Sequence, residues 1–415
     1  MVEALRKPPR KDPLQRTTVP TLPPAARSRA AQGLTRAAAL GRFALQCCSD
    51  CGTFLYPPRE ACPACLSDRL DYRDAPQSGT LLSETTIRVS NDPYFRQRSP
   101  WRIGLVQLSA GPQVICHLHD DCGAGGSSVY VTLQLDKSGQ AVFFGLPPEK
   151  QPNWADERKW REMTADPKFR RVLITDGRSA VAAALVGALQ AAECGEIFVG
   201  VSEPWKPDGA TLSKLRGLAG VTLVDLDLTS EKSVRDLAGS IGAKVDILVN
   251  TADHVRPSAL FDPAELNRGR EAMERVVMGS LRLVQAFGPV MTSRGADRAT
   301  SAAAWVNILP VYAEVNMPEF GMHSVAAAAA LSLSQWMRSE FRQGGLRVVN
   351  AFAGPLETEW FEPLPPPKVT PGALASAIVK GLKSGTEDLY VGVVAEDIRD
   401  RLASNAKAVE RELGQ

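Results

Sequence analysis

Residues 47–68 read CCSDCGTFLYPPREACPACLSD and hold five of the eight cysteines of this 415-residue chain. Two Cys-x2-Cys pairs stand ten residues apart. Each pair supplies two thiolates on one tight turn, and four thiolates suit the tetrahedral coordination of zinc. Cys47 is an alternative to Cys48, but the two-residue spacing favours Cys48. Four protein ligands leave no open position, so we predict a structural zinc ion held by Cys48, Cys51, Cys62 and Cys65.

The overall composition excludes several classes of protein. The chain has 48 basic and 46 acidic residues, a net charge of +2 and 44% hydrophobic residues. This balance differs from that of a globally basic nucleic-acid binder or an acidic disordered chain. The longest apolar stretches, such as residues 325–333, are far shorter than the ~20 residues of a membrane span. We expect neither nucleic acid nor a membrane as a partner.

Cysteine usage and the N-terminus indicate the compartment. Basic residues of the N-terminus are spread among prolines without an apolar core, so the sequence predicts no signal peptide. A local cysteine cluster in a large chain without a leader indicates a metal site in a reducing compartment, not a disulfide framework. We therefore expect a cytoplasmic protein, and the chain length predicts two or three domains.

Changes in composition divide the N-terminal half into segments. Residues 1–24 are rich in proline and basic residues and predict a mobile arm, whereas residues 25–46 are rich in Ala, Leu and Arg and predict a helix. The zinc ribbon spans residues 47–72. Residues 73–148 contain short β-rich runs separated by Gly, Pro, Asn and Asp, which indicate a small antiparallel barrel or sandwich. Residues 149–168 are polar, contain two tryptophans and are interpreted as a linker.

Residues 169–415 follow a different pattern. Apolar runs such as RVLITDG (171–177) and KVDILVNTA (244–252) alternate with alanine-rich helical segments. This alternation predicts βαβ units and a parallel sheet. The predicted fold is therefore multi-domain, with a zinc ribbon and a β-barrel followed by an α/β doubly wound parallel sheet of the Rossmann-like type.

The cysteine stretch and its context resemble the DUF35 family, a rubredoxin-like zinc ribbon joined to an OB-fold. The residues that carry the resemblance are Cys48, Cys51, Gly52, Phe54, Pro57, Pro58, Arg59, Cys62, Pro63 and Cys65. The resemblance covers about residues 25–150 and implies an OB-fold for the β-rich segment. It also implies a non-catalytic partner of thiolase-fold enzymes that act on acyl-CoA, often in the degradation of aromatic compounds or steroid side chains.

The second half resembles the short-chain dehydrogenases/reductases over about residues 168–412. RVLITDG lies at that family's first strand and glycine-rich turn, DILVNTA (246–252) is similar to its DILVNNAG segment, and Asp227 lies where an adenine-contacting aspartate is expected. The family's turn reads Thr-Gly-x3-Gly-x-Gly, because glycines let backbone amides approach a pyrophosphate. Here one glycine remains and a carboxylate is added, in Thr175, Asp176, Gly177, Ala180 and Ala182. We therefore expect no NAD(P) at this turn.

The catalytic positions of that family are also replaced. The resemblance places His323 at its catalytic tyrosine, Ala327 at the lysine four residues on, Pro310 at its serine and Val276 at its helix asparagine. None of the six tyrosines has a lysine four residues later. Asp253 adds a second carboxylate, directly after DILVNTA. His323 is either a general acid with an unusual partner or, as we expect, a structural residue.

The two resemblances lead to one prediction and two alternatives. We predict a non-catalytic accessory or scaffold subunit of a thiolase-type complex, with thiolysis of a β-ketoacyl-CoA preferred to retro-aldol cleavage of a β-hydroxyacyl-CoA. The dehydrogenase-like half is expected to self-associate, or to pair with an active dehydrogenase, through helices at residues 268–287 and 321–342. The alternatives are an atypical NAD(P)-dependent oxidoreductase and a stand-alone acyl-CoA binding protein.

Overall fold

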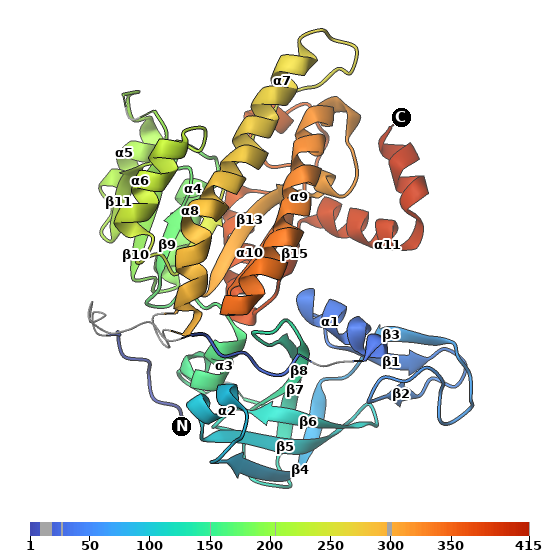
Figure 1. The fold of residues 1–415 in the computed structure, drawn as a ribbon. Coiled ribbons are helices and arrows are strands. Elements are labelled where there is room, and N and C mark those ends of the chain that lie inside the picture. The colour runs from blue at the N-terminus through green and yellow to red at the C-terminus, as the bar shows by residue number, and fades with distance from the viewer. Residues whose placement is uncertain (9–18, 26–27, 150, 204, 297–300, 415) are drawn as a thin grey trace. The chain divides into compact units, whose positions relative to one another are not determined.

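The computed structural model describes residues 1–8, 19–25, 28–149, 151–203, 205–296 and 301–414. The chain divides into two compact units, whose elements are labelled in Figure 1. The first unit consists mainly of Thr21–Ala165, with Met1–Lys7 and Lys383–Glu387, and the second mainly of Asp166–Leu382 and Asp388–Gln415. Among the described residues, no helix combines the length and the apolar character that crossing a membrane requires.

The first unit begins with a helix and a three-stranded zinc ribbon. The short turn η1 (Arg29–Ala31) and α1 (Gln32–Ala39) precede β1 (Ala44–Cys48), which pairs antiparallel with β2 (Phe54–Leu55) and β3 (Leu70–Asp74). The helix predicted over residues 25–46 therefore ends earlier than expected. The chain turns at Gly41, whose φ is +66°, and residues 44–48 pair with β3. Strand pairing outweighs the helix propensity of this alanine- and leucine-rich stretch.

A closed five-stranded barrel follows the ribbon. Its strands are β4 (Ser78–Ile87), β5 (Trp101–Leu108), β6 (Gln113–Leu118), β7 (Ser128–Leu135) and β8 (Ala141–Leu146), in the order β4-β5-β6-β8-β7. Buried and exposed residues alternate at the start of β6 and β7, as expected for a barrel wall. The short helix α2 (Pro93–Arg98), capped by the carboxylate of Asp92, follows β4 in the chain. The predicted small barrel is confirmed.

The segment 149–168 is predicted to be a polar linker, but its residues 154–163 pack against the barrel. They contain η2 (Trp154–Asp156) and α3 (Arg158–Met163). Trp160 and Met163 are 3% and 1% exposed and share a hydrophobic cluster with Trp101 and Phe144 of the barrel. Two apolar side chains spaced three residues apart thus make one buried face on a short, mostly polar helix.

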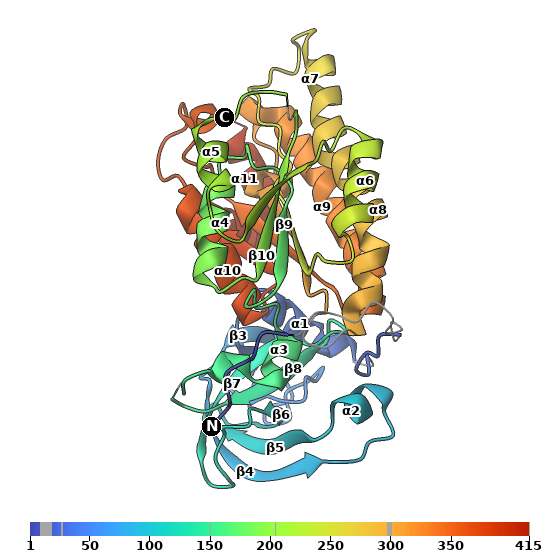
Figure 2. The same ribbon diagram turned by 90° about the vertical axis from the view of Figure 1, so that its left-hand side faces the viewer.

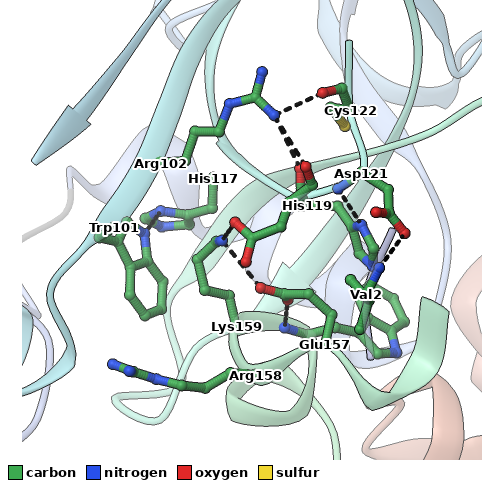
Figure 3. A network of polar contacts seen from close by, with 12 residues as sticks. Val2, Trp101, Arg102, His117, His119, Asp121, Cys122, Glu157, Arg158 and Lys159 are labelled. Atoms are coloured by element: carbon green, nitrogen blue, oxygen red, sulfur yellow. Dashed lines mark hydrogen bonds and ion pairs between the residues drawn. The ribbon is translucent and has the colours of Figure 1, made fainter. Parts of the chain in front are cut away.

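The charged residues of this segment are held by ion pairs with each other and with the barrel. Lys159 lies 3.0 Å from Glu157 and also forms an ion pair with Asp120, and Figure 3 shows the lysine and Glu157 facing each other. Nearby, the guanidinium of Arg102 donates to the carbonyl oxygens of Cys122 and Gly123 at 2.7 and 2.6 Å. Ion pairs within the unit allow these charged side chains to be buried. The polar composition of the segment therefore did not indicate that it packs against the barrel.

The N-terminal arm, predicted to be mobile over residues 1–24, also lies partly on the barrel. The backbone N–H of Val2 donates to Asp121 at 3.2 Å (Figure 3), and the carbonyl of Pro23 accepts from the Ser138 hydroxyl at 2.6 Å. These contacts use backbone atoms of the arm, which leave no signal in the side-chain pattern. Residues 9–18 of the predicted arm lie outside the described residues.

The second unit is built on a seven-stranded parallel sheet, as predicted. The strands, in sheet order, are β11 (Val221–Asp225), β10 (Glu196–Val201), β9 (Arg171–Ile174), β12 (Ile247–Asn250), β13 (Ala304–Pro310), β14 (Arg347–Ala353) and β15 (Asp388–Val391). The strand order reverses between β9 and β12. In a doubly wound sheet, the carboxyl ends of the strands at this switch point form the ligand crevice.

Helices cover both faces of this sheet. They are α4 (Ala182–Ala191), α5 (Ala210–Arg216), α6 (Glu231–Ile241), α7 (Glu265–Ala272), α8 (Gly279–Ser293), α9 (Gly321–Phe341), α10 (Pro371–Ser384) and α11 (Val393–Leu413). Figure 2 shows α6, α8 and α9 on one face and α4 and α10 on the other. The buried cluster under α8 and α9 includes Leu283, Phe287, Trp305 and Met337.

Candidate functional site

The four predicted cysteines come together in the zinc ribbon. Their Sγ atoms lie within 4.8 Å of one another, with 3.5 Å between Cys48 and Cys65 and 3.6 Å between Cys51 and Cys62. A tetrahedron of thiolates with Zn–S distances of about 2.3 Å requires S–S distances of about 3.8 Å. The residues present therefore fit a zinc ion. Bound zinc would crosslink the two turns and would have no coordination position left for a substrate.

Backbone hydrogen bonds shape each of the two turns. The N–H of Gly52 donates to the Cys48 carbonyl, and the N–H of Leu66 donates to the Cys62 carbonyl, both at 2.9 Å. Gly52 and Leu66 have φ values of +74° and +62°, so each Cys-x2-Cys pair ends next to a left-handed residue. This conformation is easy for glycine and costly for leucine. The second turn therefore depends more strongly on the crosslink that zinc supplies.

Local contacts favour the thiolate form of Cys51 and distinguish the fifth cysteine, whereas the neighbouring cysteines raise the pKa of Cys65. The hydroxyl and backbone amide of Thr53 lower the pKa of Cys51 to about 6, which favours the thiolate that zinc binds. The Sγ of Cys47, by contrast, lies 3.5 Å from the carbonyl of Gly52 and outside the four-cysteine group. The geometry therefore selects Cys48 rather than Cys47.

In the turn between β9 and α4, side chains of the turn accept hydrogen bonds from backbone amides of the same turn. Asp176 Oδ1 accepts the N–H of Arg178 at 2.8 Å, and Ser179 Oγ accepts the N–H of Val181 at the longer distance of 3.5 Å. In dinucleotide-binding folds the amides of this turn face the pyrophosphate. Burial raises the pKa of Asp176, and the nearby Arg178 only partly offsets this effect. A carboxylate thus holds a backbone amide that a phosphate oxygen would otherwise use.

The one glycine kept in this turn is required by packing. A Cβ atom at Gly177 would lie 2.6 Å from Cγ1 of Val199 and 2.9 Å from Cδ2 of Leu212. Any larger residue would push α5 and β10 away from the turn. Ala180 is exposed and Ala182 is fully buried, so together with Asp176 all three positions where the resemblance expects glycine carry side chains. The surviving glycine therefore serves the fold.

Polar residues on the side of the crevice where this fold usually binds adenosine likewise form hydrogen bonds within the chain. The guanidinium of Arg178 donates to three carbonyl oxygens in the loop 202–207, at 3.4 to 3.5 Å. Asp227 Oδ1 accepts from the backbone N–H of Thr229 at 2.9 Å and from its hydroxyl at 2.7 Å. The aspartate expected to contact adenine therefore stabilises the turn before α6.

Two of the four catalytic positions have become hydrophobic core. Val276 and Ala327, at the asparagine and lysine positions, belong to one buried cluster with Leu309 and Phe352. Their exposed fractions are 6% and 2%. Pro310, at the serine position, ends β13. None of these three side chains can carry a proton, so the usual proton relay of the resembled family has no residues here.

His323 retains an ionisable group, but it is buried. It lies in the first turn of α9, is 3% exposed, and its Nε2 donates to Asp253 Oδ1 at 2.8 Å. This bond places the proton on Nε2, and Nδ1 is buried without a hydrogen-bond partner among the described residues. The ring of Phe361 lies 6.1 Å from the imidazole. Burial alone would raise the pKa of Asp253, but its interaction with His323 outweighs burial and lowers that pKa.

The structure pairs two residues that the sequence singled out separately. Asp253 and His323 are 70 residues apart, and nothing in the spacing indicated that they meet. Sequence reasoning missed His254, whose side chain is 5% exposed and whose Nε2 lies 3.6 Å from Glu271 Oε2. Burial, with the charge of nearby arginines, lowers the pKa of His254. The only sequence signal was its position directly after Asp253.

Comparison with known families identifies three domains. The family model described as "ChsH2, rubredoxin-like zinc ribbon domain" matches residues 35–71, and "ChsH2, C-terminal OB-fold domain" matches residues 72–133. The family model described as "short chain dehydrogenase" matches residues 170–368. The zinc ribbon, the OB-fold and the dehydrogenase-like fold anticipated from the sequence are all present.

Individual relatives match the dehydrogenase-like part. Short-chain dehydrogenase PC-15 of Penicillium crustosum is 32% identical over 155 residues, which are 36% of this chain and 54% of that protein. Short-chain dehydrogenase cctT of Talaromyces islandicus is 27% identical over 158 residues, 37% of this chain and 53% of that protein. The chain thus spans about half the length of the curated relatives it matches.

A solved structure shares the same fold. The short-chain dehydrogenase of Burkholderia cenocepacia J2315, determined in complex with NADP, is 25% identical with a TM-score of 0.52, and the match covers 59% of this chain and 97% of that one. Together with the family matches, this comparison identifies the chain as a ChsH2-type zinc ribbon and OB-fold joined to a short-chain dehydrogenase domain.

Proposed function

We propose that the protein is a non-catalytic accessory subunit of a thiolase-type enzyme complex that acts on acyl-CoA. One observation carries this proposal: the second unit keeps the sheet of a dehydrogenase while its own side chains occupy the cofactor turn and the catalytic positions. A domain that keeps its fold without its chemistry is suited to a scaffold role. The zinc ribbon, whose metal ligands are all present, fits the same role.

The residues of the crevice do not fit NADP bound in the manner usual for this fold. A pyrophosphate oxygen would meet the Asp176 carboxylate, which already holds the amide of Arg178 at 2.8 Å. Two negative groups in a partly buried crevice repel each other, and the nearby charge of Arg178 only partly offsets the burial of Asp176. The side chain of Ala182 further fills the start of α4. We therefore propose no hydride transfer by this chain.

The thiolase-type partner rests on the resemblance of the first unit to the DUF35 family. The partner would supply the nucleophilic cysteine that cleaves a carbon–carbon bond, because no such activated cysteine is found outside the ribbon among the described residues. Burial raises the pKa of Cys122 to about 11 and that of Cys194 to about 12. Those thiols are protonated at neutral pH. The favoured reaction is thiolysis of a β-ketoacyl-CoA, with retro-aldol cleavage as the alternative.

The second unit offers a surface for association. Helices α8 and α9 lie side by side in Figure 1, and exposed apolar side chains lie on α9 and on the turn just before α8. Met278, just before α8, is 42% exposed, and Val325 and Trp336 on α9 are 45% and 61% exposed. Apolar groups gathered on neighbouring helices favour burial in an interface. We propose that this surface mediates self-association or pairing with an active dehydrogenase.

A second candidate function is an atypical NAD(P)-dependent oxidoreductase. The likeness to a dehydrogenase solved with NADP favours it. Titration of the purified protein with NADPH, followed by the fluorescence of the nicotinamide, separates the two candidates. We expect no saturable binding at micromolar concentrations. A clear isotherm would move the assignment to the oxidoreductase.

The accessory role is tested by affinity purification of the tagged full-length protein from its native host, with mass spectrometry of stoichiometric partners. We expect a thiolase-fold protein in near-equal amount, and its acyl-CoA cleavage should fall when this subunit is omitted. Recovery of the protein alone, in self-associated form, would contradict the proposal and favour a stand-alone acyl-CoA binding protein.

A further inference from the structure

A cavity of about 180 Å³ lies in the first unit, on the OB-fold barrel. It is bounded by α2, α3, strands of the barrel and the end of the N-terminal arm. The apolar side chains of its wall are Tyr94, Phe95, Val142 and Met163, with Pro23 and Pro24 on one side. Tyr94 and Met163 are each 1% exposed and form the deepest part of the wall.

The polar groups of the wall are already bound by the chain. Asp136 Oδ1 accepts the backbone N–H groups of Ser138 and Gln140 at 2.8 and 2.9 Å. Nδ1 of His117 accepts the indole N–H of Trp101 at 2.8 Å, as Figure 3 shows. Recognition in this cavity therefore rests on shape and apolar contact. Charged groups gain little there, because the cavity offers mainly carbon surface.

The volume limits what the cavity can hold. Packed protein interiors contain few voids larger than a water molecule. An apolar cavity of roughly 150 Å³ stays dry and binds benzene. The present cavity is slightly larger, is partly open to the surface and is lined mainly by aromatic and aliphatic side chains, so a compact ring fills it better than an extended chain of the same carbon number.

We propose that this cavity binds a single six-membered hydrocarbon ring, aromatic or saturated, belonging to a small molecule. The site is complete within one chain and does not depend on the partner enzyme proposed above. A polar or charged side chain from a partner protein is a less suitable occupant, because the wall offers mainly carbon surface.

The wall contains its own spectroscopic reporters. The ring of Trp101 lies 5.5 Å from Phe95 and 5.5 Å from His117, so a ligand against those residues changes the environment of the indole. The methyl group of Met163 is a second reporter, visible by NMR after labelling with 13C-methyl methionine. Met337, buried in the second unit, serves as the internal control for non-specific effects.

The test is a titration of the full-length protein with cyclohexanol and with 1-hexanol, which contain the same number of carbons. We expect a saturable shift of the Met163 signal, no shift of Met337, and at least ten-fold tighter binding of cyclohexanol. The absence of saturation, equal shifts at all methionines, or tighter binding of 1-hexanol would each overturn the proposal.

A filling substitution gives an independent check. Val142→Phe places a ring inside the cavity and should weaken cyclohexanol binding at least ten-fold. Ile115→Phe is the matched control, since Ile115 lies in the same barrel, is 65% exposed and is not part of the wall; its binding should equal that of the unchanged protein. Unchanged binding by a folded Val142→Phe variant contradicts the site. If that variant does not fold, the proposal is tested by the Met163 shift in the unchanged protein alone.

Discussion

The zinc ribbon and the dinucleotide turn are both short loops whose usual ligands need particular residues at fixed spacing. The ribbon keeps all four cysteines, with sulfurs within 4.8 Å of one another. The dinucleotide turn keeps only Gly177, and that residue is fixed by contact with Val199 and Leu212. Under the proposed function, fold and chemistry separate in one half of the chain and remain coupled in the other. In the ribbon, the ligand-binding residues are also the residues that make the fold.

The largest expected effect follows from that coupling. Cys62→Ser removes a buried zinc ligand, and because structural zinc supplies on the order of 10 kcal/mol to small zinc domains, the ribbon should unfold. The zinc content, measured by atomic absorption, should fall from one ion per chain to none, and hydrogen exchange of β1 to β3 should become fast.

The matched control is the neighbouring cysteine that the geometry excludes. Cys47→Ser should keep one zinc ion per chain, because Cys47 Sγ lies against the Gly52 carbonyl and outside the four-sulfur group. Loss of zinc from the Cys47 variant, or retention of metal and fold in the Cys62 variant, would show that the ligand set is wrong.

In the dehydrogenase-like half, the fold should depend on residues remote from the crevice. Asp246 and Arg294 form an ion pair with side chains 3% and 4% exposed, and Asp246 also pairs with Arg171 at 3.1 Å. Removal of one partner from a buried pair costs about 3–5 kcal/mol. Because Asp246 keeps Arg171, Arg294→Met should lower the free energy of unfolding by less than that, about 2–3 kcal/mol in urea denaturation.

An exposed ion pair in the same half provides the control. Arg216 lies 2.7 Å from Asp208 with 63% of its side chain exposed. Exposed pairs contribute about 0–1 kcal/mol, so Arg216→Met should change the urea midpoint little. Equal losses of unfolding free energy in the two variants would mean that burial does not determine how much an ion pair stabilises this half.

The sequence was most informative where local spacing carries the signal. The Cys-x2-Cys pairs, the alternation of strands and helices, and the missing glycines could all be recognised without a structure. Packing between distant segments could not. Lys159 and Glu157 had the composition of a solvated linker, yet they lie buried in an ion-paired network, and the His323–Asp253 bond joins residues 70 positions apart. Such contacts depend on tertiary folding, which short-range patterns do not encode.

Asp176 allows a smaller, pH-dependent test of the closed turn. Burial raises the pKa of Asp176 in the folded state, so the folded protein binds a proton more tightly than the unfolded chain there. The charged form therefore costs stability above the folded pKa, and this cost disappears as pH falls to the unfolded value of about 3.9. Asp176→Asn keeps an oxygen for the Arg178 amide and should be more stable than the unchanged protein at pH 7.

The gain should be constant above the folded pKa and should shrink as pH falls from that pKa toward the unfolded value, in thermal unfolding measured side by side with the unchanged protein. Asp227→Asn is a suitable control, since Asp227 is a turn carboxylate of the same half that accepts two bonds from Thr229. It should lose stability at pH 7 rather than gain it. A loss at Asp176→Asn as well would mean that the carboxylate is required, for instance by a cation.

The smallest effect on activity is expected for a substitution of His323. Substitution of a catalytic residue would instead give the largest loss of activity. His323→Gln keeps a hydrogen-bond donor toward Asp253 but cannot act as an acid or base near neutral pH. If the histidine only fills and stabilises the site beside Phe361, the activity of the assembled complex should change less than two-fold, and the unfolding free energy by about 1 kcal/mol. A thousand-fold loss of activity with unchanged folding would place proton transfer at His323 and end the separation of fold and chemistry inferred for this half.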